Sequence, residues 1–180
     1  IDCRARQGLK WEQPSRVSFG HGWVRRDAWE LFAETVSLYP PLFPLLSDES
    51  PSEAIQNGNV PTLEELNIHM GTTWAWNRPI YSHENNGHIR IELRALPAGP
   101  SIIDMVSNVA LATGLAFGLH ENIDDLLSLI PFKFVDFNFN RAAQDGLEAS
   151  LVWPNTRTHQ LREVPATEII EALLPTAEKG

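Results

Sequence analysis

Two stretches of sequence decide the fold, Gly71-Thr72-Thr73-Trp74-Ala75-Trp76-Asn77-Arg78-Pro79 and His88-Ile89-Arg90-Ile91-Glu92-Leu93-Arg94. The first is rich in threonine and tryptophan, which favour extended backbone, so residues 72–78 are predicted to form a strand. Over residues 88–96 apolar and polar side chains alternate with the two-residue period of a strand. Because Asn85-Asn86-Gly87 between the two is a turn sequence, we predict an antiparallel hairpin.

The second strand of this hairpin has one apolar and one charged face, because successive side chains of a strand point to opposite sides. The apolar face, which is expected to pack on a core, carries Ile89, Ile91 and Leu93, and the charged face carries His88, Arg90, Glu92 and Arg94. In the first strand Trp74, Trp76 and Arg78 also share one face. Which faces combine depends on the length of the turn, so the register stays open. The charged face is either a solvated ion-pair surface or a binding surface.

Helices are predicted on both sides of the hairpin. Asp27 is placed at the start of a helix that Pro40-Pro41 ends, and a polar connector at 45–61 carries a short helix at 52–56. Thr62 and Glu65 have the spacing of a capping box for a helix ending near His69. The remaining predictions are a long, mostly buried helix from Ser101 and Asp104 to Leu119, helices at 124–129, 141–145 and 167–174, a strand at 147–153, and an ambiguous alternation of phenylalanines at 132–139. The fold class is therefore α+β, an antiparallel sheet with flanking helices in one domain spanning 1–180.

Composition narrows the classes of function. The 180 residues carry a formal charge of −9, which disfavours binding to nucleic acid or to an acidic membrane surface. No apolar run reaches the roughly 20 residues that cross a bilayer, and the N-terminus lacks a signal-peptide pattern. The single cysteine, Cys3, allows no disulfide framework and makes a cytoplasmic setting the expectation. The first residue, Ile1, and a terminal helix without a following partner lead us to expect a segment of a longer protein.

The charged strand is the candidate site. Arginine binds phosphate and carboxylate through two parallel hydrogen bonds, and glutamate oxygens suit Mg²⁺, so Arg78, Arg90, Glu92 and Arg94 fit phosphoryl-transfer chemistry. One glutamate does not make a metal site, and the other acids are better explained as helix caps and solvent-facing residues. The six histidines have no metal-ligand spacing, Cys3 lies too near the terminus for an oriented nucleophile, and phosphate-loop, dinucleotide and hydrolase signatures are absent from the sequence.

The same residues carry a family resemblance. Residues 71–79, then 88–100, then Asp104-Met105 with an apolar helix resemble the glutamate-cysteine ligase family, in particular its bacterial members of the second type. The likeness extends to Phe19-Gly20-His21-Gly22-Trp23 and to segments near Trp153-Pro154 and Leu173-Leu174-Pro175. The Arg-x-Glu-x-Arg run also resembles a strand of glutamine synthetase, whose catalytic fold this superfamily shares.

The resemblance implies an ATP-dependent carboxylate-amine ligase, in which ATP phosphorylates a carboxylate and an amine attacks the acyl phosphate. It implies that Glu92 binds Mg²⁺, that Arg90 and Arg94 bind substrate carboxylate or phosphate, and that Trp76, Asn77 and Arg78 belong to the substrate and catalytic region. Family members have a further N-terminal region that supplies acidic strands. We therefore expect an incomplete site, inactive in isolation, whose sheet is completed by missing strands of the same protein or by another copy.

A second hypothesis is not enzymatic. A stable remnant of a ligase fold could bind a small carboxylate or a partner chain without turnover, because the acids that would complete a metal site are missing from the sequence. The phenylalanines at 132–139 could offer a partner surface, although alternating phenylalanines more often form core. Binding of ATP with Mg²⁺ separates the two hypotheses, since a ligase must bind the nucleotide.

Overall fold

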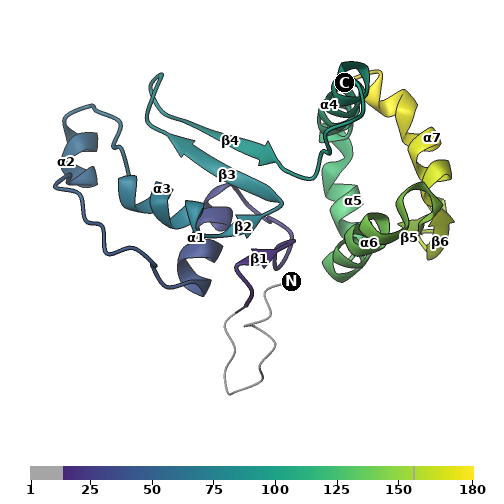
Figure 1. Ribbon diagram of the computed structural model, residues 1–180, viewed down its shortest axis with the longest axis horizontal. Coiled ribbons are helices and arrows are strands. Elements are labelled where there is room, and N and C mark those ends of the chain that lie inside the picture. The colour runs from purple at the N-terminus through teal and green to yellow at the C-terminus, as the bar shows by residue number, and fades with distance from the viewer. Residues whose placement is uncertain (1–13, 156) are drawn as a thin grey trace. The chain divides into compact units, whose positions relative to one another are not determined.

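The computed structural model describes residues 14–155 and 157–180 and contains helices together with small two-stranded sheets (Figure 1). This agrees with the α+β class at the level of mixed helix and sheet. The chain divides into two compact units, Ile1–Ala95 and Leu96–Gly180, and each is described by itself. The single catalytic domain expected over 1–180 stays a prediction.

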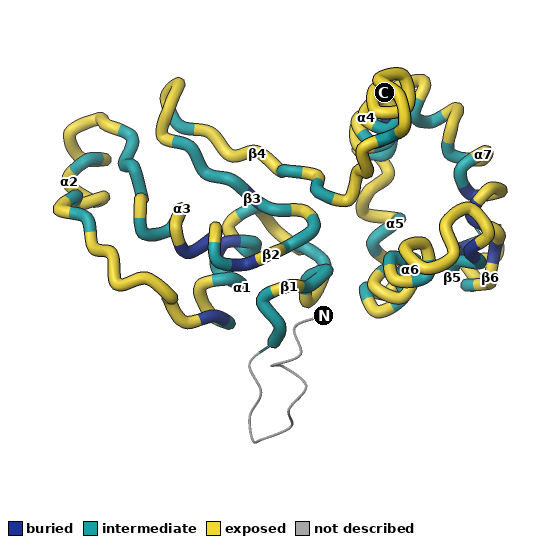
Figure 2. The backbone as a smooth tube through the Cα atoms, in the orientation of Figure 1, coloured by how far each residue is buried: buried dark blue, intermediate teal, exposed yellow. Residues whose placement is uncertain are grey.

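The first unit holds the predicted hairpin and three helices. Its elements are β1 (Val17–Ser18), α1 (Trp29–Leu38), α2 (Pro51–Gln56), α3 (Glu64–Gly71), β2 (Trp74–Ala75), β3 (Asn77–Ser82) and β4 (His88–Leu93). Phe32 and Tyr39 from the first helical region, Met70 from α3 and Pro79 from β3 are buried, and so are His69 and Thr73 (Figure 2).

The hairpin of β3 and β4 confirms the antiparallel prediction. Its strands pair from Asn77 opposite Leu93 to Ser82 opposite His88. Asn85, Asn86 and Gly87 in the turn all have positive φ, and a Cβ at Gly87 would lie 2.8 Å from a Val60 methyl carbon, so glycine is required there. The first strand is shifted from the predicted 72–78, because Trp74–Ala75 forms a separate strand that pairs in parallel with β1.

The expectation that Ile89, Ile91 and Leu93 face a core is wrong. Their exposed fractions are 51%, 47% and 42%, so this face of β4 is only half covered among the described residues. The predicted two-residue period is correct. It shows that the two faces of the strand differ in polarity, but it does not show that another element packs on the apolar face. The apolar side of β3 is better covered, since its Pro79 is buried.

The capping box predicted from Thr62 and Glu65 is also wrong. Leu63 holds the N-cap position of α3 in the left-handed conformation, with φ 49°, and makes no side-chain cap. Thr62 donates its backbone N–H and its hydroxyl to Glu49, and Glu65 accepts from Ser47. Long-range carboxylate contacts thus replace the local reciprocal cap. The helix at 52–56 is confirmed, because α2 spans Pro51–Gln56. The prediction that Asp27 is the N-cap or a first-turn acid of α1 is wrong by one residue, because Ala28 is the N-cap and Asp27 precedes it, with its Oδ1 accepting from Trp29 N at 3.0 Å.

The second unit is mainly helical. Its elements are α4 (Ile102–Gly118), η2 (His120–Asn122), α5 (Ile123–Leu129), α6 (Phe132–Asp145), η3 (Gly146–Glu148), β5 (Ser150–Pro154), β6 (Leu161–Pro165) and α7 (Ala166–Ala177). The antiparallel pair β5 and β6 leads directly into α7, with Pro165 at its N-cap. Buried Val164, Ala166 and Ile169 form the centre of this unit.

The long helix α4 begins with the predicted capping box, because Ser101 and Asp104 hydrogen-bond reciprocally. The prediction that it is mostly buried is wrong, since Gly114 is its buried residue and Ile102, Ile103 and Val106 are exposed. Gly114 and Gly118 lie against the backbone of Ala177 and Thr176, where a Cβ would clash. The helix therefore buries a narrow stripe of small residues against the end of α7.

The ambiguous phenylalanine run is helical rather than extended. It forms the start of α6, whose Asn138 is buried and donates Nδ2 to Val152 O at 2.8 Å while its Oδ1 accepts from Val152 N at 2.7 Å. These two bonds occupy the edge of β5 that β6 leaves open.

No single helix in the described ranges is long and apolar enough to span a membrane, and α4 passes the length and composition test only when joined across a 47° bend to residues 120–129.

Candidate functional site

The register of the hairpin brings three charged residues together. Arg78 lies directly opposite Glu92, and Arg94, two residues further along the strand, donates its backbone N–H to Trp76 O at 2.9 Å. Side chains on directly paired residues share a face, and so do residues two apart on one strand. Trp76, Arg78, Glu92 and Arg94 therefore share one face, which answers the question of register that the sequence left open.

Glu92 is held between the two guanidinium groups. Its Oε2 accepts a hydrogen bond from Arg94 Nε at 2.8 Å and forms an ion pair with Arg78 Nε at 3.1 Å. The Arg94 side chain is 14% exposed, that of Arg78 24% and that of Glu92 41%. The arginines are thus the better covered partners, and the carboxylate is the group nearest to solvent.

Tryptophans cover the arginine. The Arg94 guanidinium carbon lies 4.4 Å from the centre of the Trp74 ring, within the range of a cation–π contact. Trp74 and Trp76 meet edge to face, with ring centroids 6.5 Å apart. This stacking limits the positions open to the guanidinium plane and keeps it beside Glu92. We call Trp74, Trp76, Arg78, Glu92 and Arg94 the arginine cluster.

The cluster has positive charge to spare. The hydrogen bond from Arg94, and then the charge of Arg78, hold the pKa of Glu92 below its ordinary value despite some desolvation, so the carboxylate is ionised at neutral pH. Two guanidinium groups against one carboxylate leave one net positive charge. Arg94 Nη1 is buried without a hydrogen-bond partner in the described part of the chain, and the Arg78 Nε contact is not aligned as a hydrogen bond. The cluster therefore carries excess positive charge and two buried N–H donors that no described residue satisfies.

The other predicted residues lie outside this cluster. Arg90 is exposed and its Nη1 lies 3.0 Å from His88 Nε2, so it shares the face but does not reach Glu92 as an ion-pair partner. Asn77 is exposed and pairs with Leu93, on the opposite face of the hairpin from Arg78. Cys3 lies outside the described residues.

The described side chains around Glu92 do not provide the ligands that Mg²⁺ needs. Among the described residues no group of three or more histidine, cysteine or acidic side chains is placed to hold a metal ion. Glu92 brings one carboxylate, and its Oε2 already contacts both arginines. These residues do not fit a complete Mg²⁺ site, for which hard oxygen ligands from several groups are needed. Glu92 could contribute one ligand to such a site.

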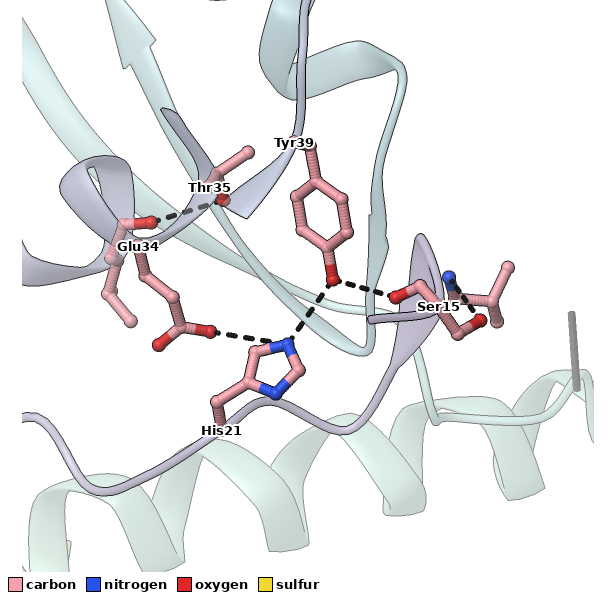
Figure 3. Close-up of polar contacts among 7 residues, drawn as sticks. Ser15, His21, Glu34, Thr35 and Tyr39 are labelled. Carbon is pink, nitrogen blue, oxygen red and sulfur yellow. Dashed lines mark hydrogen bonds and ion pairs between the residues drawn. The ribbon is translucent and has the colours of Figure 1, made fainter. Parts of the chain in front are cut away.

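A second polar cluster was not predicted from the sequence. His21 Nε2 lies 3.2 Å from the Tyr39 hydroxyl and 3.9 Å from Glu34 Oε1, and the Tyr39 hydroxyl donates to Ser15 O at 2.7 Å (Figure 3). Burial, more than any charge, raises the pKa of Tyr39, so the phenol stays protonated. The tyrosine ties the segment before β1 to the end of α1, which gives this cluster a structural role. No spacing in the sequence relates His21 to Tyr39.

An apolar cavity of about 350 Å³ lies beside α3. Residues 41–46 form one wall, and Glu65, Ile68, His69 and Thr72 form the other. The cavity was not predicted from the sequence, because residues from Leu45 onward were expected to form a polar connector. The apolar run Leu42-Phe43-Pro44-Leu45-Leu46 was the available signal.

No protein-family model matches the chain, and no match was found among curated proteins or among solved structures.

Proposed function

We propose that this chain is a segment of an ATP-dependent carboxylate-amine ligase and that the arginine cluster binds an anionic group of its substrates. The observation that carries the proposal is the hairpin register, which pairs Arg78 with Glu92 and sets Arg94 beside both. The sequence resemblance to the glutamate-cysteine ligase family and its glutamine synthetase-like catalytic fold supplies the reaction class. The geometry supplies a reason why these residues act together.

Phosphorylation of a substrate carboxylate by ATP requires fixed positive charge near the carboxylate and the phosphoryl group. Two guanidinium groups can bind such oxygens through paired hydrogen bonds and offset the charge that develops during phosphoryl transfer. Arg94 is held by Glu92 and Trp74, so little reorganisation is needed when an anion binds. Arg78 sits opposite and completes the pair. Within the proposal these two arginines orient the substrate anion, and Glu92 holds both guanidinium groups beside its Oε2.

Arg90 and Asn77 lie outside the arginine cluster, so the proposal gives the binding of the substrate anion to Arg78 and Arg94. Arg90 is engaged with His88, and Asn77 is exposed on the other face. A Mg²⁺ ion, when present with ATP, would neutralise phosphate charge, and Glu92 is the residue here that could contact it. The remaining ligands would come from elsewhere in a complete ligase.

The alternative function is a non-catalytic domain that binds a small carboxylate. The presence of one carboxylate in the arginine cluster, with no acidic partner among the described residues able to complete a metal site, favours this alternative. It needs the same arginines but no nucleotide. Calorimetry with two probes therefore separates the two functions.

The chain is titrated by calorimetry with MgATP, with L-glutamate, and with L-glutamate after saturation with MgATP. The ligase proposal predicts that MgATP binds and that both probes weaken at least tenfold in Arg94→Gln, because a charge-assisted hydrogen bond contributes about 1.5–3 kcal/mol. Arg162→Gln, an exposed arginine on β6, is the control and should leave both affinities unchanged. Binding of glutamate with no binding of MgATP would support the alternative, and binding of neither probe would refute the anion-binding role of the arginine cluster that both functions need.

In the intact ligase, Glu92→Ala is expected to abolish activity while the protein stays folded. Circular dichroism and gel filtration check the fold, and amide formation is measured with ATP and Mg²⁺ present. Activity in the Glu92→Ala variant would show that Glu92 has no essential role in the reaction.

A further inference from the structure

The cavity beside α3 has a preformed wall. Ser47 donates its N–H and its hydroxyl to Glu65 Oε1, and the hydroxyl bond is 2.7 Å long. Glu49 accepts from Thr62 N at 2.9 Å and from the Thr62 hydroxyl at 2.6 Å. These two carboxylates fix the end of the loop that carries residues 41–46 against the start of α3. The cavity of about 350 Å³ is at the small end of the range for ligand sites.

The walls are apolar and supplied mainly by the loop. Leu42, Phe43, Leu45 and Leu46 line the cavity and are exposed, as is Ile68 from α3. Exposed apolar side chains are unfavourable in water. A bound apolar group that covers them would gain about 25 cal/mol of binding free energy for each Å² of apolar surface removed from water. A compact hydrocarbon body fits this lining.

The charged residue of the lining determines which polar group a ligand can carry. Glu65 is the charged residue among those that line the cavity, and both bonds from Ser47 fall on its Oε1, so Oε2 accepts no hydrogen bond from another described residue. Hydrogen bonds from Ser47 hold the pKa of Glu65 below its ordinary value, so it is ionised at neutral pH. An ionised oxygen with free acceptor capacity attracts a cationic donor.

His69 lines the cavity but offers a ligand no accessible nitrogen. It is 8% exposed, and its Nε2 lies 3.3 Å from Thr35 O. Its Nδ1 has no hydrogen-bond partner in the described residues, but this atom is buried and out of reach of a molecule in the cavity. Thr72, the other polar residue, already donates to His69 O and accepts from Arg16.

We propose that this cavity binds a small apolar amine, with the ammonium group paired to Glu65 Oε2 and the hydrocarbon body against Leu42, Phe43 and Ile68. Glu65 gives the lining one negative charge, so a carboxylate on the same hydrocarbon body is rejected by repulsion. The site uses no residue of the arginine cluster. It can therefore succeed or fail independently of the ligase proposal.

The first experiment compares three probes that share a phenylethyl body and differ in the terminal group. Phenethylamine, 3-phenylpropionate and ethylbenzene are titrated into the full chain by ligand-observed NMR at neutral pH. Phenethylamine is expected to bind, with an affinity at least about fivefold above that of ethylbenzene, and the carboxylate is expected not to bind. Equal affinity for amine and carboxylate would overturn the proposal, and so would the absence of amine binding.

The second experiment uses matched variants. Glu65→Gln keeps an acceptor for Ser47 but removes the charge, and it should weaken the binding of phenethylamine about fivefold, as expected for a solvent-accessible ion pair. Glu64→Gln makes the same change one residue away, outside the cavity lining, and should have no effect. Phe43→Ala should weaken both phenethylamine and ethylbenzene, whereas Ile55→Ala on α2, also exposed, should weaken neither.

Equal effects of the two glutamate variants would show that the amine responds to general surface charge. Dimerisation that is lost in Phe43→Ala, with no amine bound, would assign the cavity to a second copy of the chain. Either result would refute the amine site.

Discussion

Replacing Asn138 by alanine should destabilise the second unit more than any other single polar substitution on α6. The side chain is buried and makes two hydrogen bonds to Val152, one to the carbonyl oxygen and one from the N–H. Alanine would leave both backbone groups unpaired at the edge of β5 that faces away from β6. Each such loss costs about 1–1.5 kcal/mol, so the expected decrease in the free energy of unfolding is about 2–3 kcal/mol.

Asn140→Ala is the matched control, because Asn140 is exposed and bonds within its own helix, to Asp136 O at 2.8 Å. It should change the free energy of unfolding by less than about 0.5 kcal/mol. Urea denaturation followed by circular dichroism gives the two values. Hydrogen exchange of the Val152 amide adds a local measurement, since this amide should lose protection in Asn138→Ala but not in Asn140→Ala. Equal destabilisation by the two variants would show that the bonds to Val152 do not stabilise the unit.

Three further predictions concern the first unit. Gly87→Ala should lower the free energy of unfolding by about 1–2 kcal/mol in urea denaturation, because φ is +78° and the added Cβ meets Val60, whereas Gly71→Ala, with open space at its Cβ, should not destabilise. Ile91→Asp, expected to unfold a buried strand, should instead leave the chain folded at a cost below about 1.5 kcal/mol, because Ile91 is 47% exposed; loss of cooperative thermal melting would contradict this. Hydrogen bonds from Thr62 lower the pKa of Glu49, and hydrogen bonds from Ser47 lower the pKa of Glu65. The two ionised glutamates therefore contribute fully to stability above the ordinary carboxyl pKa, and this contribution is lost as pH falls through the lowered pKa values. The urea midpoint should therefore fall with acidification in the wild type and fall less in the Glu49→Gln, Glu65→Gln double variant, and identical pH profiles would refute the contribution.

The hairpin could be predicted because its signals are local. Alternation over residues 88–93 and the Asn-Gly turn need no tertiary information. The shared face of Arg78 and Glu92 could not be predicted, since it depends on the full length of the turn between Ser82 and His88. A shift of one residue would have placed Arg78 on the other side.

Errors arose where distant residues decide local structure. Thr62 and Glu65 have the spacing of a capping box, but Glu49 and Ser47 compete successfully for their hydrogen bonds. The phenylalanines at 132, 134, 137 and 139 have spacings of two and three residues, which left the segment ambiguous between strand and helix; it is helical, and its Asn138 hydrogen-bonds to β5. The burial expected for α4 failed because apolar composition does not specify a covering layer.

The stacking of Arg94 on Trp74 has a practical consequence. Indole emission responds to the electric field across the ring, and a guanidinium 4.4 Å from the ring centre contributes strongly to that field. Any anion that draws Arg94 away from its place would shift or quench the fluorescence of Trp74. The hairpin thus carries an intrinsic optical reporter, and in a background where the other tryptophans are replaced by phenylalanine, occupancy could be followed without a label.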